Sequence, residues 1–125
     1  MNILLWISQG LLAAMFLMAG LMKLSKPKIE LSEKLGNWVD SYSLNTIKLI
    51  GLLEFLAAVG LILPLAINIF PILTPIAAIG LAVVMIGAMN LHYKRGEKDK
   101  IGMNLILFLL SVFVVFGRFY LVPTI

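Results

Sequence analysis

The sequence predicts an all-α integral membrane protein, a four-helix bundle with a short interfacial amphipathic helix between its first and second spans. Of its 125 residues, 62% are hydrophobic and 13% are charged. In a typical soluble domain, about 45–50% of the residues are apolar and ~25% are charged. The apolar residues form four runs of the length that crosses a bilayer as a helix, roughly 17–25 residues. We expect one transmembrane domain over residues 1–125, with spans at about 3–24, 47–64, 75–92 and 101–122.

The first apolar run is expected to be a retained span. Residues 1–5 carry no basic side chain, and the apolar run is longer than the hydrophobic core of a signal peptide. Gln9, Gly20 and Lys23 fall near one helical face. Gln9 is expected to hydrogen-bond another helix, and Lys23 can reach the membrane interface from the end of the span.

The polar stretch at residues 25–46 follows. Its apolar residues recur at helical spacing, which predicts an amphipathic helix in the interface with Trp38 and Tyr42 as headgroup-level anchors. Gly36 weakens this helix. Two interpretations stay open for the segment, a connector lying in the interface or a lid over the mouth of a cavity.

The second run contains a carboxylate, Glu54, about 10 Å along the helix from Ile47. A charge at that depth costs ~2.5–3.5 kcal/mol on insertion scales. Gly51 and Ala58 lie on the same side and permit close helix contact, so Glu54 should face the bundle. Lys23 is the expected cation beside it. Glu54 therefore belongs either to a structural ion pair or to a site that binds a ligand headgroup or passes a proton.

Proline and polar residues mark the boundaries and faces of the later spans. Pro64 should end or kink the second span, and Thr74 with Pro75 suits the start of the third. His92 ends the third span, where it is either an interfacial side chain or a group that exchanges protons. In the fourth span, polar residues recur at every seventh position, which places them on one stripe: Asn104, Ser111 and Arg118.

The basic residues predict an orientation. Nine of the ten Lys and Arg lie in or beside the first and third connections, and the positive-inside rule then places both connections in the cytoplasm and both termini outside. All four spans thereby contribute polar groups to the cytoplasmic half of the bilayer. The candidate ligand-binding or proton-relay residues are Glu54, Lys23, His92, Arg95 and Asn104. Arg118 is the candidate on the outer side, as an interface anchor or a binder of phosphate or carboxylate.

Several function classes are excluded or disfavoured. Without cysteine there are no disulfides, thiolate nucleophiles or cysteine-ligated clusters. A single histidine argues against a bis-histidine haem or a histidine-rich metal site. No nucleotide-binding or hydrolase motif is present, so we assign no catalytic residue and no metal ligand. The basic residues lie beside apolar runs and are not expected to bind nucleic acid.

Three stretches resemble the DoxX-like family of small four-span bacterial membrane proteins. They are FLMAGLMKL at 16–24, IGLLEFLAAVGLILP at 50–64 and TPIAAIGLAVVMIGAMNLHYKRGE at 74–97. The resemblance implies a four-helix membrane bundle in the bacterial cytoplasmic membrane, with Lys23, Glu54 and His92 as family-like polar positions. The family is named after a subunit associated with thiosulfate:quinone oxidoreduction, and other members are thought to join redox-linked complexes.

The resulting expectation is a small subunit or accessory protein of a quinone-linked redox process, with quinone as the ligand. Chemistry would occur only within a complex. Two other functions stay open, a carrier of a lipid or small amphiphile and a structural scaffold of a membrane complex. The expected partners are the lipid bilayer, a membrane redox protein and further copies of the chain in a homo-oligomer.

Overall fold

The computed structural model describes residues 1–123, and within them it is helical without strands, with four helices long and apolar enough to cross a membrane. This confirms the expected fold class. The elements in chain order are α1 (Asn2–Ser25), α2 (Lys28–Leu35), the 3-10 helix η1 (Asn37–Ser41), α3 (Leu44–Ala66), α4 (Leu73–Lys94), α5 (Lys98–Phe116) and a π-helical turn η2 (Gly117–Leu121).

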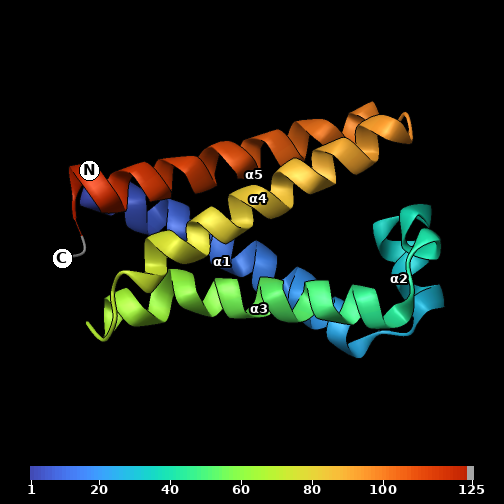
Figure 1. The fold of residues 1–125 in the computed structure, drawn as a ribbon, viewed down its shortest axis with the longest axis horizontal. Helices are drawn as coiled ribbons and strands as arrows, with labels where there is room; N and C mark the ends of the chain where they lie inside the picture. The colour runs from blue at the N-terminus through green and yellow to red at the C-terminus, as the bar shows by residue number, and fades with distance from the viewer. Residues whose placement is uncertain (124–125) are drawn as a thin grey trace.

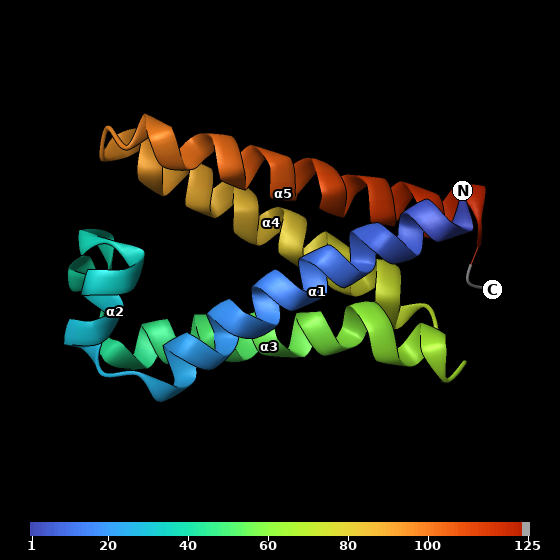
Figure 2. The same ribbon diagram turned by 180° about the vertical axis from the view of Figure 1, so that it is seen from behind.

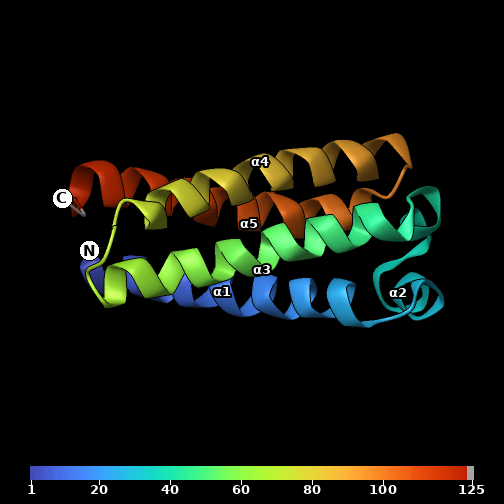
Figure 3. The same cartoon turned by 60° about the horizontal axis from the view of Figure 1, so that its bottom comes forward.

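The long helices are arranged as two pairs. Helix α1 packs along α3, and α4 packs along α5 (Figure 1). The N-terminus and the end of α5 lie at one end of the bundle, here called the terminal end, whereas α2 and η1 lie at the other, the α2 end (Figure 2 and Figure 3). The pairs lie close together at the terminal end and separate towards the α2 end.

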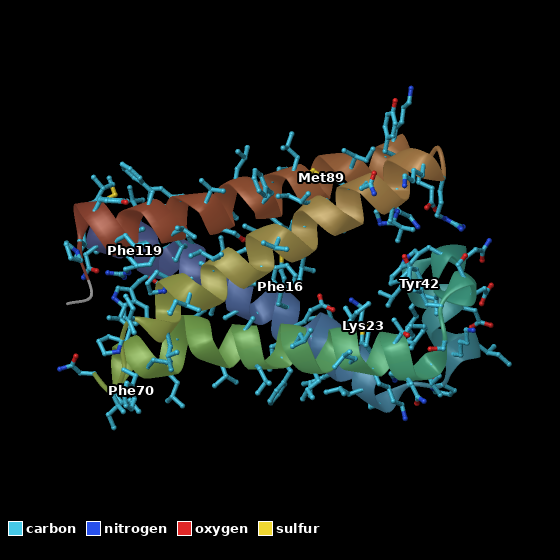
Figure 4. All side chains as sticks on the ribbon, viewed as in Figure 1. Phe16, Lys23, Tyr42, Phe70, Met89 and Phe119 are labelled. Carbon is cyan, nitrogen blue, oxygen red and sulfur yellow. The ribbon has the colours of Figure 1, made fainter. Side chains whose placement is uncertain are left out.

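An apolar core joins the two pairs. Phe16 of α1 lies within it and points between the pairs (Figure 4). The other buried members are Leu12, Ala58, Leu61, Ala78, Leu81, Met85, Leu107 and Val114. The outward faces expose large apolar side chains such as Ile3, Leu49 and Val83, as expected for surfaces that contact lipid tails.

Two glycines set the contact between α1 and α3. A Cβ atom added to Gly20 would lie 2.7 Å from the backbone oxygen of Gly51, and one added to Gly51 would lie 2.6 Å from Cβ of Lys23. Only glycine therefore permits the two backbones to approach this closely, as at other membrane helix contacts. The crossing lies one turn from both Lys23 and Glu54.

Pro64 neither ends nor interrupts the second span, because α3 continues to Ala66. Proline has no N–H, so the carbonyl of Gly60, four residues earlier, loses its helical donor. The hydroxyl of Thr74 donates a 2.9 Å hydrogen bond to that carbonyl. Thr74, at the start of α4, thus supplies the hydrogen bond that the Gly60 carbonyl of α3 lacks because of Pro64. This bond ties the two helix pairs together at the terminal end.

The expected amphipathic helix between the first two spans is present in two pieces instead of one. Gly36 ends α2 with φ of 114°, a conformation that favours glycine, and the chain then turns into η1. Leu31 and Val39 pack with Ile47 of α3 in a second buried cluster. Tyr42 packs against this cluster and edge-on to Trp38, with ring centroids 6.0 Å apart.

The glycine crossing predicts a position-specific cost of adding a methyl group to α1. Gly20→Ala should lower the free energy of unfolding by about 1–3 kcal/mol, the usual range for overpacking, because the new Cβ meets α3 backbone atoms. Gly10→Ala is the matched control on the same helix, since its Cβ meets no atom within 4 Å. Chemical unfolding in detergent micelles measures both variants, and an equal effect at the two positions would contradict the assignment.

Candidate functional site: a cavity at the α2 end

A cavity of about 490 Å³ lies between the two helix pairs in the half of the bundle nearer α2. All four long helices and the α2–η1 segment contribute to its wall. Most of the lining is aliphatic, including Ile50, Val84 and Leu107. The side chains that bring polar groups or aromatic rings to it are Lys23, Glu54, His92, Asn104, Phe16, Trp38 and Tyr42.

Lys23 and Glu54 form a buried ion pair on this wall. The ammonium of Lys23 donates to Oε1 of Glu54, and the two residues are only 8% and 3% exposed. The pairing between the first two spans is therefore present as expected. Lys23 points into the space between the helix pairs (Figure 4), and its Nζ lies 5.9 Å from the ring centroid of Trp38, within cation–π range.

Asn104 brings an unused donor to the same cavity from α5. Its Nδ2 is buried and has no hydrogen-bond partner within residues 1–123. A buried amide left unpaired costs roughly 1–3 kcal/mol. An acceptor carried by a ligand in the cavity would satisfy this nitrogen.

His92 enters the cavity wall from the end of α4 and is held from behind by Glu97. Gly96, with φ of 73°, turns the chain so that Glu97 folds back. Nδ1 of His92 lies 3.1 Å from Oε1 of Glu97, and since a carboxylate only accepts, Nδ1 carries the hydrogen. A neutral His92 consequently keeps Nε2 as an acceptor. The imidazole also packs edge-on to Trp38, at 6.4 Å between centroids.

Glu97 is the centre of a charged cluster at the α2 end. Nε of Arg95 donates to its Oε1 at 2.9 Å, and Nζ of Lys100 lies 3.3 Å from its Oε2. The hydrogen bond from His92, followed by those from Arg95 and Lys100, lowers the pKa of Glu97 from 4.5 to about 2. The carboxylate is therefore ionised over the whole physiological range.

The α2–η1 segment covers the cavity and is tied to α5. Nζ of Lys100 donates to the carbonyl oxygen of Leu35 at 3.3 Å, and the indole of Trp38 donates to the same oxygen at 3.0 Å. Leu35, Trp38 and Tyr42 all line the cavity. This arrangement fits a lid instead of a bare connector. Trp38 packs edge-on to both Tyr42 and His92, and both rings line the cavity. Their expected role as headgroup-level anchors stays a prediction.

The cavity also reaches the outer surface of the bundle. Met15 of α1 and Leu53 of α3 line it, yet they are 41% and 52% exposed. Residues at these positions face the hydrocarbon of a surrounding bilayer. The lining is thus continuous with the lipid-facing surface beside α1 and α3.

The structure brings together four of the candidates named from the sequence, Glu54, Lys23, His92 and Asn104. Arg95 does not line the cavity and acts beside His92 through Glu97. Arg118 lies at the terminal end, hydrogen-bonded to Gln9. No three His, Asp or Glu side chains within residues 1–123 are grouped as metal ligands.

Sequence reasoning missed Glu97, which was not among the candidate residues. A weak signal was available, because a glycine just after a helix often adopts a left-handed conformation that reverses the chain, which can return the next residue towards the last helical turn. The inward position of Trp38 had no comparable signal, since its direction depends on the break at Gly36.

The ion pair predicts a strongly non-additive response to apolar substitution. Lys23→Met alone leaves a buried carboxylate unpaired and should cost about 3–5 kcal/mol of unfolding free energy, whereas Lys23→Met with Glu54→Leu should recover most of that loss. Unfolding of the single and double variants in micelles measures the coupling. Additive losses would show that the pair is not coupled.

The Glu97 cluster predicts a pH window for stability. Because the native pKa of about 2 lies below the ordinary value of 4.5, its contacts contribute stability that is fully present above pH 4.5 and is lost as the pH falls towards 2. The melting-temperature difference between wild type and Glu97→Gln should be constant above about pH 5 and shrink below it. Asp99→Asn is the control, since Asp99 forms no ion pair among the described residues. A difference that grows on acidification would contradict the assignment.

Comparison with known proteins places this arrangement in a family. Searches of curated proteins and of solved structures returned no match. The sequence profile of the DoxX-like family matches residues 7–114. This region contains α1 from Ile7, all of α3 and α4, α5 up to Val114, and every polar residue of the cavity wall. The chain is a multi-pass membrane protein and belongs to the DoxX-like family.

Proposed function

We propose that the cavity at the α2 end binds a quinone and that the protein acts as a small subunit or accessory protein of a quinone-linked redox process. The observation that carries the proposal is the buried Lys23–Glu54 pair on the wall of an otherwise apolar cavity. Ionisable groups inside a membrane span mark ligand or proton pathways by default.

The polar groups of the wall suit the two ends of a quinone ring. Lys23 donates one of its three ammonium N–H groups to Glu54, which leaves two for a ligand carbonyl. Asn104 supplies a buried amide N–H without a partner within residues 1–123. A quinone carries two carbonyl acceptors on an apolar ring, so it can use both donors while the aliphatic wall contacts the ring and tail.

Entry from the bilayer also favours this class of ligand. Quinones are dissolved in the hydrocarbon, and the exposed lining residues Met15 and Leu53 give the cavity a lipid-facing border. A ligand can therefore keep its tail in the membrane while its ring lies beside Lys23. A water-soluble substrate would have no use for such a border.

In the proposed reaction, the protein manages protons and a partner redox protein supplies electrons. Reduction of a quinone to a quinol takes up two electrons and two protons. Glu54 is the proton-passing group next to the ring, and His92, with its Nε2 acceptor, connects the ring to the Glu97 cluster. We place the α2 end on the cytoplasmic side of a bacterial inner membrane because the basic residues gather there.

A second candidate is a binder or carrier of a lipid or another small amphiphile. The largely aliphatic wall and its exposed border support it. This function needs no proton-passing carboxylate, so it predicts that Glu54→Gln binds its ligand as well as wild type does. Native mass spectrometry of the protein extracted from its membrane would identify a retained quinone or lipid by mass.

Trp38 gives a direct test of quinone binding. The chain has two tryptophans, and Trp6→Phe leaves Trp38 on the cavity wall as the reporter. Titration with a short-chain ubiquinone or menaquinone analogue should quench its fluorescence saturably. Adding Glu54→Gln should weaken the apparent affinity roughly ten-fold, since it removes the charge that orients Lys23.

The matched control is Glu33→Gln, a carboxylate on the exposed face of α2 that does not line the cavity. It should bind the analogue like its parent. Equal affinity of the Glu54 and Glu33 variants would remove the quinone proposal and leave the amphiphile carrier, whereas absence of saturable quenching in the parent would count against both ligands at this cavity.

A further inference from the structure

A second buried cation lies at the terminal end, far along the bundle from the cavity. Arg118, on the π-helical turn η2, is 2% exposed. Its Nε donates to Oε1 of Gln9 and its Nη1 to Oδ1 of Asn2, both at 2.7 Å. The guanidinium stacks over Trp6, with 5.2 Å between its carbon and the ring centroid. Its Nη2 is buried and has no partner within residues 1–123.

No side chain of the described bundle balances this charge. All six acidic residues of the chain lie at the α2 end or in the half of the bundle nearer to it: Glu30, Glu33, Asp40, Glu54, Glu97 and Asp99. Each lies on α2, η1, the α4–α5 turn, the start of α5 or the α2 half of α3. Arginine does not lose its proton in proteins. The partners present are neutral amide oxygens and an aromatic face, which leave a net positive charge.

The fold holds Arg118 in this position by several independent contacts. A Cβ atom on Gly117 would lie 2.2 Å from Cδ2 of Leu5, so glycine permits α1 and the end of α5 to meet there. Gln9 is itself fixed, because its Nε2 donates to the carbonyl oxygen of Leu61 at 2.5 Å. The π-helical turn, closed by the 2.7 Å bond from the Val122 N–H to the Gly117 carbonyl, is a conformation often found at functional sites.

From these contacts we infer that Arg118 is an anion site that takes a phosphate group. Its Nη2 carries two N–H groups without a partner within residues 1–123, and guanidinium groups are the donors that proteins favour for phosphate oxygens. The site lies at the ends of the spans, at the level where lipid headgroups begin. The phosphate comes either from a phospholipid or from solution. Residue 118 lies beyond the matched family region, 7–114, and the site is independent of the proposed quinone cavity.

Trp6 provides the reporter for this site. Since Arg118 is covered, phosphate binding requires a small local movement, and Trp6 stacks on the guanidinium that must move. Trp38→Phe leaves Trp6 as the only tryptophan. In an uncharged maltoside detergent at constant ionic strength, this variant is titrated with inorganic phosphate, with a short-chain phosphatidylglycerol and with the matching diacylglycerol that lacks phosphate.

The expected result is a saturable change in Trp6 fluorescence with the phosphatidylglycerol and none with the diacylglycerol. A response to inorganic phosphate as well assigns the site to free phosphate, whereas a response to the lipid alone assigns it to a headgroup. Adding Arg118→Gln should raise the apparent Kd at least roughly ten-fold, as expected for loss of a charged hydrogen bond. Arg95→Gln, which removes an arginine from the other end, should leave the titration unchanged.

A second variant keeps the test decisive if Arg118→Gln does not fold. Gln9→Glu places a carboxylate oxygen where the Gln9 amide oxygen accepts from Arg118, so it supplies an anion from within the chain, although it loses the hydrogen bond that Gln9 donates to Leu61. It should stay helical by circular dichroism and lose the phosphate response. The inference would be overturned if the parent gave no fluorescence response, or if the Arg118→Gln and Gln9→Glu variants responded as the parent does. Neither result would bear on the quinone cavity.

Discussion

A charged group inside a membrane span has to find a partner there, and the Lys23–Glu54 pair answers this requirement at the α2 end. The pair depends on the close crossing of α1 and α3, which in turn depends on Gly20 and Gly51 having no side chain. Once paired, the two side chains form one polar patch on an apolar wall. The ring of Trp38 borders the same patch, because it lies within cation–π distance of Lys23.

The two ends of the bundle meet the same requirement in different ways. At the α2 end a cation is neutralised by a carboxylate, and the helix pairs separate around a cavity. At the terminal end Arg118 is surrounded by neutral amides and an indole, and the helices are tied by Gln9 to Leu61 and by Thr74 to Gly60. One end is closed by hydrogen bonds to backbone carbonyls, whereas the other is held by side chains around Glu97. The separated helix pairs at the α2 end therefore leave room for a ring and its tail, whereas the terminal end has no cavity of that size among the described residues.

Much of the fold could be predicted from the sequence because hydropathy and length constrain a membrane span strongly. The pairing of Lys23 with Glu54 could be predicted too, since the energetic cost of an isolated carboxylate demands a cation from a neighbouring helix. The contact between His92 and Glu97 could not, because it depends on the backbone turn at Gly96. The direction of Trp38 depends likewise on the break at Gly36, and local periodicity continued the helix through that point. The hydroxyl of Thr74 replaces the missing Pro64 N–H as the donor to the Gly60 carbonyl. Thr74 lies ten residues after Pro64, and no sequence rule predicts this contact.

The Lys23–Glu54 pair has a further consequence for how the protein enters the membrane. It joins consecutive spans, separated only by α2 and η1, so both charges belong to one helical hairpin that leaves the ribosome before α4 and α5. Each charge would oppose the partitioning of its own span, but together they can enter as a neutral hairpin before α4 and α5 are synthesised. The glycine crossing would then form during insertion, and the second hairpin would dock onto a surface that already presents the ion pair. In this order of assembly, the cavity is completed last, when His92 and Asn104 arrive opposite a pair that has already formed.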